Sequence, residues 1–336
     1  MDKITKCLLK KDISCKPVWF MRQAGRYLPE FRKIRKSNPD FIKLCLNSEL
    51  SSEITLQPIK RFDLDAAIIF SDILIVPFAL GQNINFDEKK GPILSKLDIE
   101  NFKKLKENKF LTILKPVYNT LEQTRKKLDK NKALIGFVGA PWTLAVYMLG
   151  LKNDNKLNIE LLKKKETDIK FIIEKITEYL CLHIERQVNA GANVIQIFDS
   201  WSGLILQDKL IDCCFKPNLK LVNFCKKIGV PVISFPKGIK KEYKSFVEYV
   251  KPDGINIDPD INPAWASLNM KNICIQGGLN PTLLLKNSDL LKNSIDIYLE
   301  EFKNVPYIFN LGHGILPSTH PETVKNVVNI IKNKNE

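Results

Sequence analysis

Short apolar runs alternate with longer amphipathic segments along most of the chain. The apolar runs are continuous and rich in Ile, Val and Phe, which is typical of strands that are covered on both faces, as in a parallel sheet. We predict strands at 66–71, 134–138, 194–198, 230–235, 254–257, 273–276 and 307–311. An earlier extended piece at 17–21 is either an eighth strand or the lead-in to the first.

Helical periodicity fills the intervals between these runs. The clearest case covers 166–189, where Ile and Leu recur on one stripe. A last helix is expected to begin at Pro321, because proline suits the first helical turn and Glu322 beside it favours the helix dipole. His183 lies near the apolar stripe of the 166–189 helix and is interpreted as structural. His320 is interpreted as a loop or cap residue.

Seven or eight strand–helix repeats predict a single α/β domain over 1–336, a (β/α)8 barrel of the TIM type with an N-terminal extension. A doubly wound open sheet is the alternative. No glycine-rich phosphate fingerprint follows the first strand, which weakens the nucleotide-binding version of that alternative. No linker that would separate two domains is evident.

The charge balance is strongly positive but selects no partner by itself. The 336 residues include 52 Lys+Arg and 37 Asp+Glu, a formal net charge of +15. Such a balance suits nucleic acid, an anionic membrane or an acidic substrate. Many of the lysines fall in polar stretches with few aromatic residues, such as 101–109, 125–132 and 152–165, so we interpret them as solvated surface and expect no nucleic-acid partner.

The cysteines and the apolar segments indicate a reduced, cytoplasmic protein. None of the eight cysteines forms a CxxC pair or has a histidine at zinc-finger spacing, so no metal site is predicted. The N-terminus lacks a signal-peptide core. The most apolar stretch, 64–80, carries Asp65, Asp72 and Pro77, which favours buried strands over a membrane span.

Candidate site residues follow the predicted strands, at the end of a barrel where active sites are built. Asp72 follows the first strand, Tyr147 the second, Ser200 the third, and His313 the last. Taken alone, an Asp after a strand is often a helix cap and a Tyr often packs in a core. His313 is harder to explain by packing, because it stands between two glycines.

A compact segment upstream is dense in hydrogen-bond donors. Residues 17–30 read PVWFMRQAGRYLPE and place Arg22 and Arg26 four apart, with a glycine between them. The planar guanidinium can donate two parallel hydrogen bonds to a carboxylate. The alternative is a surface turn with ordinary solvated arginines.

This segment resembles the N-terminal signature of the uroporphyrinogen decarboxylases. Four further segments resemble conserved stretches of that family in the same order and spacing, from about residue 15 to 330: FSDIL at 70–74, GFVGAPWT at 136–143, QIFDSW at 196–201 and NLGHG at 310–314. The combination of five co-linear segments is far more specific than any one of them.

The resemblance implies a distorted barrel that works as a homodimer and converts the four acetate side chains of uroporphyrinogen III to methyls, giving coproporphyrinogen III and carbon dioxide. It implies substrate contacts for Arg22, Gln23, Ala24, Gly25, Arg26, Asp72, Tyr147, Ser200 and His313. No cofactor is expected, because a pyrrole protonated on a ring carbon can itself accept the electrons of the broken C–C bond.

Two residue types carry this expected chemistry. A carboxylate only accepts hydrogen bonds, so Asp72 suits the pyrrole N–H groups and would stabilise the positive charge that develops on them. Arg22 and Arg26 suit the rim carboxylates. The proton donor stays open among Arg22, His313 and a substrate carboxyl, since a guanidinium is a very weak acid.

The competing function within the same superfamily is a corrinoid- or thiol-dependent methyltransferase, which holds zinc through His and Cys. Its His-x-Cys motif near the end of the barrel is absent, because Cys274 has no histidine two residues before it. The sequence therefore favours the decarboxylase.

Overall fold

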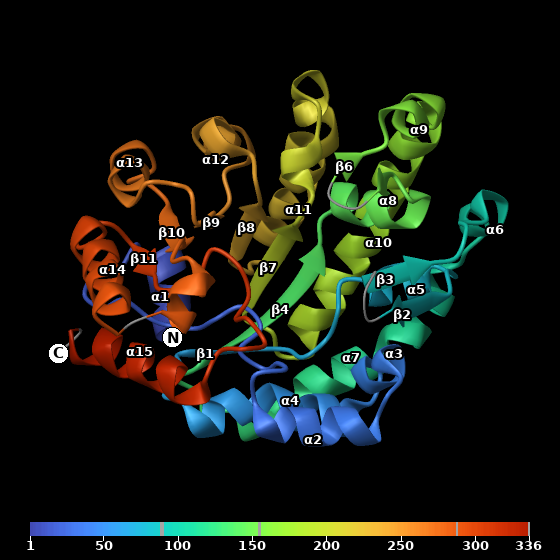
Figure 1. Cartoon of the computed structure of the whole chain (residues 1–336). Helices are drawn as coiled ribbons and strands as arrows, with labels where there is room; N and C mark the ends of the chain where they lie inside the picture. The colour runs from blue at the N-terminus through green and yellow to red at the C-terminus, as the bar shows by residue number, and fades with distance from the viewer. Residues whose placement is uncertain (88–90, 154–155, 287, 335–336) are drawn as a thin grey trace.

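The protein is a distorted parallel barrel. The computed structural model describes residues 1–87, 91–153, 156–286 and 288–334. Within these residues, seven parallel strands form one curved sheet in the order β1-β4-β7-β8-β9-β10-β11. Figure 1 shows the strands in the middle of the molecule with helices around them. The predicted α/β barrel class is confirmed.

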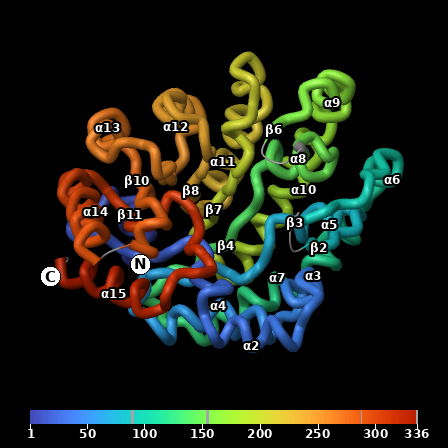
Figure 2. Tube along the Cα trace, viewed as in Figure 1, coloured from blue at the N-terminus to red at the C-terminus, as the bar shows by residue number. Residues whose placement is uncertain are grey.

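The strands of this sheet are β1 (Ala66–Ile68), β4 (Ala133–Gly139), β7 (Val194–Asp199), β8 (Val232–Pro236), β9 (Gly254–Ile257), β10 (Cys274–Gly277) and β11 (Tyr307–Ile308). Two antiparallel hairpins stand outside it, β2 (Ile84–Asp87) with β3 (Gly91–Leu94) and β5 (Lys152–Asn153) with β6 (Lys156–Leu157). The tube in Figure 2 shows the first hairpin and α6 projecting from one side of the molecule.

The α-helices are α1 (Lys3–Leu9), α2 (Pro29–Ser37), α3 (Phe41–Cys45), α4 (Ser48–Arg61), α5 (Ile75–Ala79), α6 (Ile99–Lys103), α7 (Glu107–Lys127), α8 (Pro141–Leu149), α9 (Ile159–Lys164), α10 (Glu166–Asn189), α11 (Lys216–Lys227), α12 (Tyr243–Val250), α13 (Pro263–Asn269), α14 (Ser288–Glu301) and α15 (Pro321–Asn333). The helix α10 has the predicted bounds, and α15 begins at the predicted proline. Among the described helices, none has the length and hydrophobicity needed to cross a membrane.

The segment 17–21 closes the ring between the last strand and the first. Val18 forms a parallel bridge with Phe309, directly after β11, and the Trp19 N–H donates to the Phe309 carbonyl at 3.3 Å. On its other side, the Asp65 N–H donates to the Val18 carbonyl at 2.9 Å, just before β1. The segment therefore takes the place of an eighth strand without the regular ladder of one.

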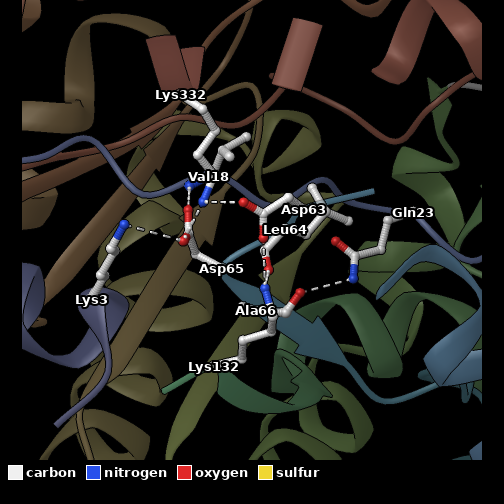
Figure 3. A network of polar contacts seen from close by, with 9 residues as sticks. All are labelled: Lys3, Val18, Gln23, Asp63, Leu64, Asp65, Ala66, Lys132 and Lys332. Atoms are coloured by element: carbon white, nitrogen blue, oxygen red, sulfur yellow. Dashed lines mark hydrogen bonds and ion pairs between the residues drawn. The ribbon is translucent and has the colours of Figure 1, made fainter. Parts of the chain in front are cut away.

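A buried carboxylate fastens this closure (Figure 3). Asp65 Oδ2 accepts the Val18 N–H at 2.8 Å, and Oδ1 accepts the ammonium of Lys332 from α15 at 2.7 Å. The Lys3 ammonium lies 3.9 Å from Oδ1. The Asp65 side chain thus links the closing segment to the first helix through Lys3 and to the last helix through Lys332.

The first and last predicted strands are shorter than their apolar runs. The regular strand ends at Ile68, the Ile69 N–H still donates to the Ile135 carbonyl of β4 at 3.0 Å, and the Phe70 N–H donates to the Thr55 hydroxyl in α4 at 2.8 Å. Past β11, Phe309 contacts the closing segment through a single bridge. The other five strands lie within two residues of the predicted bounds.

Two apolar cores hold the barrel. One fills its interior, where side chains such as Trp19, Ile135 and Ile233 meet Ile4 and Leu8 of α1, which packs against this interior core. The other, much larger, lies between the sheet and the surrounding helices. A barrel filled in this way is rigid, so the loops that leave its strands have fixed starting points.

Candidate active site

The predicted site residues converge at the carboxyl ends of the strands, around Arg22. Its positive charge acts on Asp72, Tyr147 and His313, so these four side chains share one neighbourhood. They come from four separate parts of the chain. Parallel strands present their carboxyl ends at one face, which explains the convergence.

The loop that carries Arg22 is tied to the loop that carries His313. The Met21 N–H donates to Asn310 Oδ1 at 3.1 Å, and the Ile315 N–H donates to the Met21 carbonyl at 2.9 Å. Arg22 itself has a φ of 60°, a left-handed conformation that is unfavourable for a side chain of this kind. The two loops therefore form one unit that holds Arg22 in an unusual backbone geometry.

Gly314 is the point of closest approach between these loops. A Cβ added there would lie 2.4 Å from Arg22 Cδ and 2.6 Å from Cγ. Only glycine leaves room for the arginine stem at this position. The glycine next to His313 thus places Arg22.

Gln23 is committed to the protein. Its side chain is buried and accepts the Phe20 N–H at 3.1 Å while donating to the Ala66 carbonyl in β1 at 3.0 Å. Its own carbonyl accepts the Tyr27 hydroxyl at 2.7 Å. Gln23 therefore fastens the arginine loop to the first strand, and a direct contact of its side chain with substrate stays a prediction.

Arg26 lies exposed on the same loop, beside the half-buried Ala24 and Gly25. Its carbonyl accepts the Arg32 guanidinium at 2.9 Å, which fixes its backbone. In the described part of the chain, no carboxylate forms an ion pair with the Arg26 guanidinium. The guanidinium is thus available to an anionic ligand.

Asp72 combines the role of a turn residue with that of a site residue. Its Oδ1 accepts the Leu74 N–H at 2.8 Å, which orders the turn before α5. Desolvation raises the pKa of this carboxyl, against the opposing effects of the Leu74 bond and the Arg22 charge. Among the described residues, none donates a hydrogen bond to Oδ2, so this oxygen can accept from a ligand.

Tyr147 and Trp201 form an aromatic wall near Asp72. Their rings meet edge to face with centroids 5.9 Å apart, and burial raises the pKa of the Tyr147 hydroxyl, which stays protonated at neutral pH. The buried Trp201 indole N–H has no acceptor in good hydrogen-bond geometry among the described residues, although it is close enough to the Tyr147 hydroxyl to lower that group's pKa. Ser200, half-buried, directly follows β7. This wall offers apolar contact through its rings and two hydrogen-bond donors, the Tyr147 hydroxyl and the Trp201 indole N–H.

A second buried carboxylate supports the wall from behind. Asp199 accepts hydrogen bonds from the Thr143 hydroxyl at 2.7 Å and the Asn218 amide at 3.1 Å, and burial raises its pKa to about 6. The Thr143 hydroxyl in turn accepts the backbone N–H of Trp201 at 3.1 Å. Asp199 lies in the QIFDSW segment, yet the sequence predicted no role for it, because its burial against α8 and α11 is visible only in the structure.

His313 faces two cations. Desolvation and the charges of Lys237 and Arg22 lower its pKa to about 4, so its imidazole is neutral at pH 7 in the substrate-free protein. Lys237 was not among the predicted site residues, although it directly follows β8 as Asp72 and Ser200 follow their strands. The strand-end rule, applied to every strand, would have found it.

The other two histidines lie where the sequence placed them. His183 is buried in α10 and shares a 3.0 Å hydrogen bond with the Tyr118 hydroxyl. His320 precedes α15 and accepts the Glu322 N–H as its cap. Within the described ranges, no three His, Cys, Asp or Glu side chains gather as a metal site would require.

Known proteins resemble this chain over nearly its full length. A family model described as uroporphyrinogen decarboxylase (URO-D) matches residues 1–334. The uroporphyrinogen decarboxylase of Orientia tsutsugamushi (strain Ikeda) is 40% identical over 340 residues, which cover 99% of this chain and 98% of that protein. The one of Rickettsia bellii (strain RML369-C) is 41% identical over 321 residues, 94% of each.

A solved methyltransferase from Methanosarcina mazei shares the fold, with a TM-score of 0.80 at 18% identity, covering 98% of this chain and 97% of that one. At that identity the likeness concerns the fold alone. The family model and these relatives agree with the resemblance carried by the five sequence segments. The chain belongs to the uroporphyrinogen decarboxylase family.

Proposed function

We propose that this protein decarboxylates the four acetate side chains of uroporphyrinogen III, giving coproporphyrinogen III and carbon dioxide. The observation that carries the proposal is the site around Asp72: one carboxylate with a free oxygen, a cation beside it, and further cations toward the rim. The substrate has the complementary pattern, with N–H donors at its centre and carboxylates at its edge.

Asp72 would receive the pyrrole N–H groups on its free Oδ2. A ring carbon of the pyrrole is protonated, the acetate C–C bond breaks as carbon dioxide leaves, and its electrons neutralise the ring cation. The exocyclic methylene that remains takes a second proton, and loss of the first proton from the ring carbon restores the neutral pyrrole with a methyl in place of the acetate. A fixed carboxylate beside the ring nitrogen lowers the energy of the cationic intermediate. Because the pyrrole is its own electron sink, we expect no metal and no organic cofactor to be needed.

Arg22, Arg26 and His313 would hold substrate carboxylates, and Tyr147 and Ser200 would contact the macrocycle through a ring and a hydroxyl. Each charge-assisted hydrogen bond in such a site contributes about 1.5–3 kcal/mol. Ala24 and Gly25 would approach the substrate with their backbone, and Gln23 would position the loop. The proton donor is Arg22, His313 or a substrate carboxyl, because a carboxylate bound beside His313 would raise the pKa of its imidazole.

The decisive assay supplies uroporphyrinogen III under anaerobic conditions and separates the products by number of carboxyl groups. We expect the eight-carboxyl substrate to give way to the four-carboxyl product through the intermediate species. Protein dialysed against a strong chelator should react at the same rate. Stoichiometric zinc with chelator-sensitive activity would instead favour the methyltransferase, the function of the protein that shares this fold.

Three further statements belong to the same proposal. The chain forms one domain over 1–336, works as a homodimer, and acts in the cytoplasm. The family supports the dimer, and sedimentation at micromolar concentration should give about twice the mass of one chain. A fully active monomer would contradict the dimer without affecting the proposed reaction.

A further inference from the structure

Lys237 is held in place by its own backbone. Its N–H donates to the Asp199 carbonyl at 3.1 Å and to the Phe235 carbonyl at 3.0 Å. Its carbonyl accepts the Gly203 N–H at 2.9 Å and the Ser202 hydroxyl at 2.9 Å. Every polar backbone group of the residue is thus bound to the end of β7, the end of β8 or the loop that follows β7.

The next residue reinforces this position. A Cβ on Gly203 would lie 2.7 Å from the Gly238 carbonyl oxygen and 2.8 Å from its Cα, and Gly238 itself has a φ of 84°. Two glycines are needed for the two loops to touch in this way. The side chain of Lys237 therefore starts from a rigid point at the edge of the site.

The ammonium of Lys237 forms no ion pair with any residue that the structure describes. The residue is half-buried, yet among the described residues no carboxylate lies within 4 Å of it. The carboxylate of Asp258 is close enough for the Lys237 charge to lower its pKa, but it lies beyond ion-pair distance, and its Oδ2 already accepts the Gly238 N–H at 2.5 Å and the Tyr243 hydroxyl at 2.7 Å. A partly desolvated cation without an anion is unfavourable unless a ligand supplies one.

The position of Lys237 also indicates which part of the ligand it meets. Its charge acts on His313, and it is not among the charges that shift the pKa of Asp72 within the described residues. Lys237 directly follows β8, which is three strands along the sheet from β1, the strand that precedes Asp72. A group held by Lys237 is therefore at a different part of the strand-end face from the pyrrole nitrogen that Asp72 would bind.

We propose that Lys237 is a specificity-determining residue that binds a rim carboxylate of the tetrapyrrole, one that is not lost in the step under way. This inference rests on the proposed function. It predicts an effect on binding that is similar in each of the four decarboxylations, with little effect on the chemical step. It adds a third cationic side chain, after Arg22 and Arg26, from the opposite side of the site.

The test compares Lys237→Met, which keeps the stem and removes the charge, with Lys237→Arg, which keeps the charge. Lys244→Met is the matched control, because Lys244 is an exposed lysine on the neighbouring α12. We expect Lys237→Met to raise KM about tenfold, the size of one partly shielded charge-assisted contact. The kcat should change less than about twofold, Lys237→Arg should recover most of the binding, and Lys244→Met should match the parent protein.

The outcomes distinguish a failure of the proposed function from a failure of the inference about Lys237. If the parent protein and Lys244→Met both fail to decarboxylate uroporphyrinogen, the proposed function is wrong. If both are active and Lys237→Met keeps the parent KM, the inference about Lys237 is wrong. A fall in kcat alone, or the build-up of a single intermediate, would also overturn it. Should Lys237→Met fail to fold, Lys237→Gln carries the same expectation.

Discussion

A single methyl group on Gly314 should disable the site through Arg22. The added Cβ would lie 2.4 Å from Arg22 Cδ, whereas carbon atoms in contact prefer about 3.5–4.0 Å. The arginine stem must therefore move by about 1 Å or more. The backbone of Gly314 accepts alanine, because its φ lies outside the left-handed region, so the strain is relieved by the side chain of Arg22.

The expected loss of activity follows from the effect of such a shift on a catalytic side chain that must be held in place. A displacement of about 1 Å near reacting atoms can cost up to about 100-fold in rate. We expect Gly314→Ala to lower kcat/KM by about 10- to 100-fold, or about 1.4–2.7 kcal/mol of transition-state stabilisation. The urea midpoint should change little, because Arg22 is exposed and its side chain can move without opening a core.

A double-mutant cycle checks that the effect passes through the arginine. The four proteins are the parent, Gly314→Ala, Arg22→Ala and the double variant, each assayed for uroporphyrinogen turnover. If Gly314 acts only by placing Arg22, the double variant should be no worse than Arg22→Ala alone. Additive losses, or a Gly314→Ala protein with parental kcat/KM, would refute the reasoning.

Three further predictions test other parts of the structure. Asp72→Asn should lower kcat about 10²- to 10³-fold with the fold retained, and near-parental turnover in a folded variant would end the assignment of Asp72. Burial lowers the pKa of His183 to about 3, below its ordinary 6.5, so the unfolded chain binds a proton that the folded chain does not, and stability should fall as the pH drops below 6.5. In His183→Gln the urea midpoint should fall less between pH 7 and 4.5, and an unchanged slope would contradict this. Asp65→Asn should lower the free energy of unfolding by about 1–3 kcal/mol, because it removes the ion pair with Lys332 and weakens the Val18 bond; a midpoint equal to the parent's would show that the closure does not depend on that charge.

The features that sequence predicted are those with a local cause. The apolar stripe of α10 and the continuous runs of the inner strands determine their own secondary structure, so their positions could be predicted closely. The grouping of Asp72, Tyr147 and His313 followed from one topological rule, because parallel strands end at the same face. Their proximity to Arg22 came instead from the family resemblance.

What sequence missed depends on contacts between distant segments. The fit of Gly314 against Arg22 joins residues almost three hundred positions apart, and no local pattern signals it. Asp199 reads as a polar residue after a strand until its partners from α8 and α11 are known. Lys237 was one of many lysines in a basic chain, and only its half-buried place without an ion pair among the described residues distinguishes it.

The closing segment explains why the site and the barrel depend on each other. Val18 completes the ring between β11 and β1, and Arg22 follows four residues later on the same stretch of backbone. In a regular barrel an eighth strand would fill that gap with its own ladder. Here the irregular segment leaves the ring through Met21, whose N–H and carbonyl both bond to the 310–315 segment. The arginine loop is therefore anchored at one end by barrel closure and at the other by the hydrogen bond from Gln23 to Ala66 of β1. A change that loosens the closure should displace Arg22 before the fold itself is lost.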